Sequence, residues 1–270
     1  MSNKIGWCDE TWNPIIGCSK VSRGCDNCYA ERFAKRLAEM PQTTQSYGRV
    51  VGGKGWTGDV VLQNDMVTKP QRWKNPKYVF VNSMGDLFHE KVPFGWIDEV
   101  MSIIATCPQH LFIVLTKRPE RMKKYADYAL KYDNLDHEIA RAMGYEKHVY
   151  GAWPLKNLVL GVSIEDQRTA DARIPFLLDT QAEARVISYE PALRGVRLGY
   201  DVMAKTDWVI AGAEKGPKAR DIDVQDFLYV MEECRDANVP FYFKGTYVSK
   251  KWTTSLCCRE YTERYKYVRE

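Results

Sequence analysis

From about residue 76 onward, six short apolar runs recur, and each is followed by polar residues and then by an amphipathic stretch. The runs cover residues 78–83, 111–116, 158–163, 185–190, 208–213 and 240–245. Each is nearly continuous in apolar residues, as is typical of parallel strands that are covered on both faces. Their alternation with helical stretches predicts a parallel sheet built from strand–helix–strand units.

The stretches between the runs have the apolar periodicity of helices. Helices are predicted from Pro93 to Thr106, from Pro119 to about Leu130, from Gln167 to about Leu178 and from Val224 to Ala237. One more strand is predicted near the N-terminus, from Trp12 to Ile16. The predicted fold class is therefore α/β, a partial or full (β/α) barrel of the TIM type. A flat, doubly wound sheet is the alternative, because the element spacing fits both.

Two stretches interrupt this rhythm. Residues 41–76 are polar and glycine-rich and are interpreted as an insertion in a barrel that spans residues 1–246. Residues 132–156 are expected to form a loop or a short helix between strands. After the barrel, residues 247–270 form a basic, aromatic tail.

Composition narrows the class of protein. A chain of 270 residues can bury a full core, and 45% apolar with 27% charged residues is ordinary for a globular protein. The formal net charge of +4 permits a nucleic-acid partner without requiring one. No apolar run is long enough for a signal peptide or a membrane span. We therefore expect a cytoplasmic protein with no membrane partner.

The strongest local signal is a group of three cysteines, Cys18, Cys25 and Cys28, with the spacing C-x6-C-x2-C. In a reducing compartment such a group favours metal binding or redox chemistry over disulfides. Three thiolates can hold a [4Fe–4S] cluster and leave one iron open to a small molecule. A helix predicted from Ala30 to Leu37 would direct its positive N-terminal end toward the thiolates.

A structural zinc site is the main alternative for these cysteines. Such a site usually needs four ligands, and Cys8, ten residues upstream of the first cysteine of the motif, could be the fourth. Cys107 and Cys234 lie on predicted apolar helix faces and are expected to be core thiols. The adjacent Cys257 and Cys258 are expected to be bystanders, although a second metal site in the tail stays open.

Polar residues follow the predicted strands at their carboxyl ends, which is where (β/α) barrels have their active sites. Solvated loops would also be polar, but the recurrence over six strands favours one polar pocket. A turn at residues 83–86 offers carbonyl groups and the Asp86 carboxylate to an ammonium group, and Glu165 could accept from ribose hydroxyls. Lys117 and Arg118 could contact a carboxylate or a phosphate.

From these strand ends we select two sets of candidate residues. The candidates for cofactor binding are Ser83, Met84, Gly85, Asp86, Ser163 and Glu165. The candidates for catalysis are Lys117, Glu190, Glu214 and Lys244. The histidines fall in no nucleophile motif; His110 is expected to be structural, and His89 could reach the pocket.

Six long segments occur in order over about residues 7–245. They are WNPIIGCSKVSRGCDNCYAER, FVNSMGDLFHEKVP, LTKRPERM, LGVSIEDQRTADARIPFLL, ISYEPAL and WVIAGAEKGPKARDI. Together they resemble the phage-associated three-cysteine-motif proteins, which are similar to radical S-adenosylmethionine (SAM) enzymes. The resemblance implies a radical-SAM-like barrel in which Cys18, Cys25 and Cys28 hold a [4Fe–4S] cluster and SAM binds the open iron.

The resemblance also implies roles for the strand ends. Met84, Gly85 and Asp86 resemble the Gly-Gly-Glu turn that contacts the SAM amino group, and Ser163 and Glu165 would lie at the ribose-contacting strand end. The sequence departs from the usual motif in two respects. Six residues instead of three separate the first two cysteines, and the turn has Met and Asp in place of Gly and Glu.

The activity that the resemblance implies is cleavage of SAM to a 5′-deoxyadenosyl radical by an enzyme of the isomerase or lyase class. The implied substrate is nucleic acid or a nucleotide-linked group, for example a modified thymine in phage DNA whose attached group is isomerised. The resemblance also implies an external electron donor as a partner. For a phage-encoded protein the implied location is the host cell cytoplasm. The basic, aromatic tail fits a nucleic-acid partner, although a solvated amphipathic end would have the same composition. Two alternatives stay open, namely an iron–sulfur binding or sensing protein without SAM cleavage and a DNA-repair lyase for a pyrimidine lesion.

Overall fold

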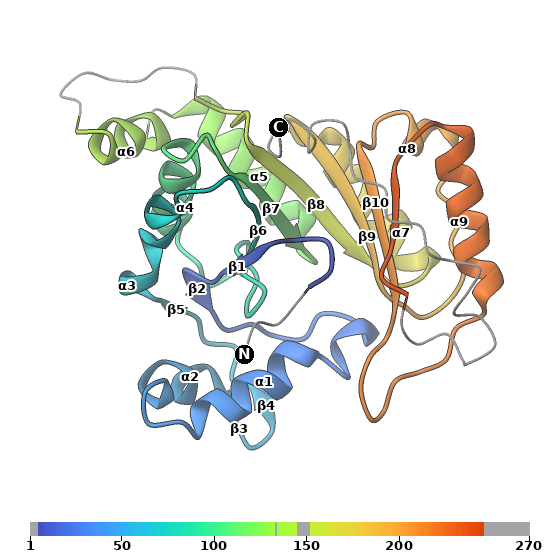
Figure 1. The fold of residues 1–270 in the computed structure, drawn as a ribbon, viewed down its shortest axis with the longest axis horizontal. Helices are drawn as coiled ribbons and strands as arrows, with labels where there is room; N and C mark the ends of the chain where they lie inside the picture. Colours follow the sequence, from blue (N-terminus) through green and yellow to red (C-terminus); the bar gives the residue numbers. More distant parts are fainter. Residues whose placement is uncertain (1–4, 133, 145–151, 246–270) are drawn as a thin grey trace.

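A curled sheet of seven parallel strands organises the part of the chain that this computed structural model describes, residues 5–132, 134–144 and 152–245 (Figure 1). The strands lie in chain order, β1 (Glu10–Trp12), β6 (Tyr78–Val81), β7 (Leu111–Thr116), β8 (Leu158–Ile164), β9 (Ala184–Ala192), β10 (Trp208–Ala213) and β11 (Phe241–Phe243). A doubly wound sheet would reverse its strand order, so the flat alternative is wrong. Among the described residues β1 and β11 do not pair, which makes the sheet an open half-barrel rather than a full barrel.

Helices connect the strands and cover the outer face of the sheet (Figure 1). The main ones are α4 (Phe94–Ala105), α5 (Pro119–Lys131), α7 (Gln167–Asp179) and α9 (Val224–Asp236). These four predicted helices, and the helix predicted from Ala30 to Leu37, which is α1 (Tyr29–Ala38), are thus confirmed to within about two residues at each end, the ordinary uncertainty of helix boundaries. The smaller α6 (Asn134–Ala142) and α8 (Tyr200–Met203) lie between them. No helix in the described ranges has the length and apolar character needed to cross a bilayer.

The predicted N-terminal strand is wrong in its bounds. The sheet uses Glu10–Trp12 instead, and Ile15–Ile16 form a separate strand, β2, that pairs antiparallel with β5 (Val61–Leu62). The break falls at Asn13 and Pro14. Pro14 has no N–H for a ladder, and the Asn13 side chain accepts from the Met84 amide at 2.8 Å, so the chain leaves the sheet at this point.

The segment at residues 41–76 folds into several short elements beside α1 (Tyr29–Ala38). They are α2 (Thr44–Val50), the hairpin of β3 (Val51–Gly52) and β4 (Gly55–Trp56), β5, α3 (Asn64–Val67) and the 3₁₀ helix η2 (Lys69–Arg72). Figure 1 shows α1 and α2 side by side. A small apolar cluster that includes Ala30, Ala34, Tyr47 and Val50 joins them.

Alternating side chains divide the core into two parts. On β7, Phe112 and Val114 pack outward against the helices, whereas Leu111 and Ile113 point into the half-barrel. The inner cluster comes mainly from the amino-terminal halves of the strands, with Trp7, Tyr78, Val159, Ala184, Val186, Trp208, Ile210 and Tyr242. Because apolar side chains fill that end, a ligand can enter the half-barrel at the carboxyl ends of the strands.

A buried carboxylate joins α4 to α5. The Asp98 side chain is 2% exposed and accepts from the hydroxyl groups of Tyr125 at 2.8 Å and Tyr128 at 3.4 Å. Burial raises the pKa of Asp98, although the tyrosine hydrogen bonds oppose the shift. Because the folded-state pKa lies above the unfolded-state value, ionisation of Asp98 weakens folding as the pH rises through that interval.

We expect Asp98→Asn to keep the hydrogen bond from Tyr125 and to remove the cost of burying a charge. Relative to the natural protein it should be at least as stable at neutral pH, and this advantage should vanish below the unfolded-state pKa of about 4. Asp98→Leu leaves the Tyr125 hydroxyl unpaired and should lose about 1–3 kcal/mol. Denaturant unfolding at both pH values measures the differences, and an Asn variant less stable than the Leu variant would contradict the role.

Candidate functional site

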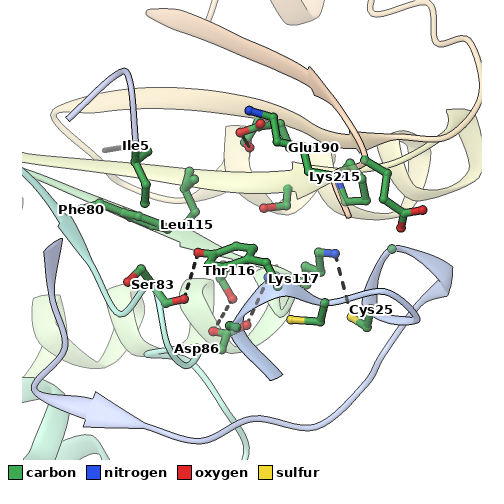
Figure 2. Close-up of a pocket in the computed structure, with 18 of the residues that line it drawn as sticks. Ile5, Cys25, Phe80, Ser83, Asp86, Leu115, Thr116, Lys117, Glu190 and Lys215 are labelled. Carbon is green, nitrogen blue, oxygen red and sulfur yellow. Dashed lines mark hydrogen bonds between the residues drawn. The ribbon is translucent and has the colours of Figure 1, made fainter. Parts of the chain in front are cut away.

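A cavity of about 570 Å³ lies at the carboxyl ends of the strands, against the segment that carries the cysteine motif (Figure 2). Cys25 ends the 3₁₀ helix η1 (Arg23–Cys25), and Cys28 caps the N-terminus of α1. Of the residues selected from the sequence, the cavity is lined by Cys18, Cys25, Cys28, Ser83, Gly85, Asp86, Lys117, Ser163, Glu190, Glu214 and Lys244. Met84 and Glu165 lie outside this lining, since Met84 is part of the apolar cluster beneath α1 and Glu165 lies under the cysteine-bearing loop.

Two consecutive cations at the end of β7 contact two of the cysteines. The Lys117 ammonium lies 3.9 Å from Cys25 Sγ, and the Arg118 guanidinium donates to Cys18 Sγ at 3.7 Å. Each cation also pairs with a buried carboxylate, Lys117 with Glu165 at 2.8 Å and Arg118 with Asp86 at 3.1 Å. Positive charge is therefore fixed beside the thiols, where it would stabilise thiolates.

The Asp86 carboxylate is fully engaged by the protein. It accepts from the Thr116 hydroxyl at 2.7 Å and from the backbone amides of Phe88 and Lys117, in addition to Arg118. A carboxylate offers about four acceptor sites, so the contact expected between Asp86 and a SAM amino group would have to replace one of these bonds. In this conformation Asp86 orients Arg118.

Glu165 anchors the cysteine-bearing loop. Its side chain is 1% exposed and accepts from the Ser22 hydroxyl at 2.7 Å and from Arg173 at 3.1 Å, besides Lys117. Burial opposes ionisation, but Lys117 and Arg173 outweigh it and hold the pKa of Glu165 below its ordinary value. Gly24 packs directly on this side chain. A ribose contact by Glu165 would therefore require the loop to move.

Glu214 fixes the other side of the same loop. Its carboxylate accepts from Asn27 at 2.9 Å and from the Arg220 guanidinium at 2.6 Å. Burial again opposes ionisation, and the Arg220 and Asn27 hydrogen bonds lower the pKa of Glu214. Arg220 also donates to the Arg23 carbonyl at 2.8 Å, so the segment after β10 holds the loop by both charge and backbone contacts.

Glu190 and Lys244 face the cavity from β9 and the end of β11. Their charged atoms lie 2.7 Å apart, and their side chains are 18% and 20% exposed. Gly212 makes room for the pair, because a Cβ at this position would lie 2.6 Å from Glu190 Oε1. Figure 2 shows Glu190 and Lys215 across the cavity from Cys25. Glu190 and Lys244 are therefore the candidate catalytic residues that are directed at a ligand rather than at the cysteine-bearing loop.

The other cysteines and histidines in the described ranges are not part of the cavity lining. Cys107 and Cys234 are buried core thiols, as predicted. Cys8 packs beside the inner apolar cluster, and burial raises its pKa to about 12.

His89 does not line the cavity, and its Nε2 lies 2.9 Å from the Ser19 hydroxyl. His110 is buried with Nε2 3.2 Å from the Pro70 carbonyl, which fits a structural role. Cys257, Cys258 and the tail lie outside the described residues.

The thiols at the cavity are the kind of donor that a metal cluster requires, but they are not yet arranged as a metal site. In the described ranges no three His, Cys, Asp or Glu side chains already form a group able to hold a metal ion. The three thiols of the motif nevertheless share one cavity, and two of them, Cys18 and Cys25, have a cation beside them. Burial and the nearby Asp86 raise the pKa of Cys18 to about 12. Metal binding must therefore remove the Cys18 proton and bring the three sulfurs together.

A family model described as "Protein of unknown function (DUF5131)" matches residues 2–265. The chain belongs to the DUF5131 family. No curated protein and no solved structure matches the chain. The match covers both the cysteine-bearing loop and the strand ends around the cavity, so both features lie within the region that the family model describes.

Gly24 provides a test of how the loop is anchored in this DUF5131 protein. A Cβ at Gly24 would lie 2.5 Å from Glu165 Cγ, and the Glu165 side chain is held by three partners and cannot easily yield. We expect Gly24→Ala to lower the free energy of unfolding by about 1–3 kcal/mol. The control is Gly53→Ala, where a Cβ would meet no atom within 4 Å and the change should stay within about 0.5 kcal/mol. Equal effects in denaturant unfolding would contradict this packing.

Proposed function

We propose that this protein is a radical-SAM-like enzyme in which Cys18, Cys25 and Cys28 hold a [4Fe–4S] cluster. The observation that supports the proposal is that all three thiols line one cavity at the carboxyl ends of an open parallel half-barrel. That end of a (β/α) barrel is where catalysis takes place in known enzymes. When bound, the cluster would supply the electron that cleaves SAM to a 5′-deoxyadenosyl radical. An external electron donor would reduce it.

Lys117 and Arg118 would stabilise the bound cluster by charge. Their N–H groups already lie near Cys25 and Cys18, and hydrogen bonds to sulfur ligands raise the reduction potential of iron–sulfur clusters. Glu165 and Asp86 hold the two cations in place. The four side chains therefore act as positioning residues for the cysteine site.

The SAM site is proposed at the turn of residues 83–86 and at Ser163. A Cβ at Gly85 would lie 3.0 Å from the Gly17 carbonyl, so this turn packs against the backbone that leads into the cysteine motif. Carbonyl oxygens of the turn would accept from an ammonium group. A molecule bound there would lie next to the thiols, which is what the proposed cofactor requires.

Glu190 and Lys244 are proposed as the groups that hold or move a proton on the substrate. They form a close ion pair in the cavity lining, and Figure 2 shows its Glu190 member on the side opposite Cys25. The proposed substrate is nucleic acid, for example a modified thymine in phage DNA, or a nucleotide-linked group, and the reaction an isomerisation. Arg23, which is exposed and adjoins the lining residue Gly24, and the exposed Tyr29 of the lining support an anionic, base-containing substrate, which the net charge of +4 permits. The proposed location is the cytoplasm, where the thiols stay reduced.

A cluster-binding or sensing protein without SAM cleavage is the second candidate function. It is favoured by one observation, the full engagement of Asp86 by protein donors. A repair lyase for a pyrimidine lesion would share the proposed chemistry and differ in its substrate.

Anaerobic reconstitution tests the cluster. We expect about four iron atoms per chain in the natural protein and loss of most iron in Cys18→Ala, Cys25→Ala and Cys28→Ala, because each removes one ligand. Cys8→Ala should keep the iron, and loss of iron there would favour a site with four protein ligands. With SAM and reductant the loaded protein should release 5′-deoxyadenosine. A loaded cluster whose spectrum ignores SAM, with no product, would instead support the second candidate function.

Lys117→Met tests the effect of the cation on the cluster. Removing the N–H near Cys25 should lower the reduction potential, so that the reduced-to-oxidised ratio at a fixed applied potential falls by roughly tenfold, or about 59 mV for one electron. Redox titration followed by EPR measures the change, and Lys117→Arg should largely restore it. Lys215→Met removes another positive charge from the cavity lining. An equal shift there would show that the effect is not specific to Lys117.

A further inference from the structure

Two buried hydrogen-bond donors of the cavity lack a partner. Trp7 Nε1 and Asn82 Nδ2 belong to side chains that are 1% and 3% exposed, and neither atom has a hydrogen-bond acceptor. In the described ranges four buried side-chain polar atoms are unpaired in this way, and these two line the same cavity. Because buried donors in folded proteins are nearly always paired, two unpaired donors at one cavity indicate a ligand with acceptor atoms.

The two donors lie at the apolar end of the cavity. The Trp7 ring packs on Phe80, with ring centroids 4.9 Å apart. Val81 pairs with Val114, so the sheet register brings Asn82 level with Leu115 on the next strand. Figure 2 shows Ile5, Phe80 and Leu115 grouped away from Cys25. This end therefore combines flat apolar walls with two donors and is separate from the cysteine end.

The backbone holds Asn82 in a set position. Its φ of 58° is left-handed, which asparagine tolerates better than most residues. The Asn82 amide donates to the Trp12 carbonyl at 2.7 Å, its carbonyl accepts from Gly85 at 3.1 Å, and Oδ1 accepts from the Ile15 amide at 3.4 Å. With these groups engaged, Nδ2 is the part of the residue left for a ligand. A conformation held at so many points is typical of a preorganised binding site.

We propose that the apolar end of the cavity is a binding site for a planar heterocycle with carbonyl oxygens, which accept hydrogen bonds from Trp7 Nε1 and Asn82 Nδ2. Phe80 supplies an aromatic surface for such a ring, and Leu115 and Ile5 supply apolar contacts. The Trp7 ring is 1% exposed and is covered by Phe80, Trp208 and the Lys244 ammonium, so Trp7 contributes its N–H group. The unpaired groups are donors, so a ligand with acceptors on its edge fits them better than one with donors. None of its residues is a proposed cluster ligand, so the site can be tested without the cluster, although Asn82 directly precedes the turn proposed for SAM.

The test uses the full-length protein and 1,3-dimethyluracil, a flat ring whose edge carries two carbonyl acceptors and no N–H donor. Titration followed by NMR should show saturable binding to the natural protein. Trp7→Phe and Asn82→Asp should each weaken that binding by roughly fivefold to tenfold, because each removes one donor and keeps much of the side-chain volume. Trp73→Phe, which changes an indole outside the cavity lining, should leave the affinity unchanged.

A second probe separates hydrogen bonding from apolar contact. Toluene has a similar ring without acceptors, so the natural protein and Asn82→Asp should bind it equally. Absence of saturable binding of 1,3-dimethyluracil to the natural protein would overturn the proposal. So would unchanged affinity in Asn82→Asp. Thermal unfolding checks that each variant is folded, and if Trp7→Phe fails to fold, Asn82→Asp decides the question alone.

Discussion

Two buried ion pairs that begin at consecutive residues, Lys117 and Arg118, hold the cysteine-bearing loop against the half-barrel. Lys117 pairs with Glu165 and Arg118 with Asp86, and both carboxylates are almost fully removed from solvent. Charges are costly to bury, so such pairs are stable when further hydrogen bonds satisfy each group. Ser22 supplies one of these bonds to Glu165 from the loop itself. The buried ion pairs are therefore fully hydrogen-bonded only when the loop lies in this position, and the same pairs hold the loop there.

The inner face of the sheet decides where a ligand can lie. Large apolar side chains fill the amino-terminal ends of the strands, whereas small residues occur among the inward positions farther along. Gly161 and Gly212 would clash with neighbouring side chains if they carried a Cβ, and Ser163 and Ser188 line the cavity. The space is bounded by the thiols at one end and, at the other, by Phe80 and by the two donors Trp7 Nε1 and Asn82 Nδ2. Two chemically different groups could therefore be held within reach of each other.

The alternation of apolar runs and amphipathic stretches along the chain predicted most of the strands and helices of the fold. The run at residues 111–116 became β7 without change, and the helix predicted from Gln167 ends within one residue of its predicted end. Apolar periodicity predicts such elements well because the burial of their faces is a local requirement. The N-terminal strand was mispredicted because Pro14 and the contact of Asn13 with a distant turn override a short apolar run. The choice between a closed and an open sheet also depended on pairing between strands distant in sequence, which periodicity does not contain.

For the candidate site, the sequence by itself determined the chemistry that is available, namely three closely spaced thiols and a series of polar strand ends. These are local features, since spacing and residue type are read directly from the chain. Only the tertiary structure decided which groups meet. It assigned Glu165 and Glu214 to anchoring the loop through Ser22 and Asn27, which lie 143 and 187 residues away in the sequence. It also placed Trp7 and Asn82 in the lining of one cavity, where the described residues offer Trp7 Nε1 and Asn82 Nδ2 no acceptor. The physical reason is that hydrogen bonds and ion pairs act over a few ångströms in space, and the fold alone brings residues so far apart in sequence within that range.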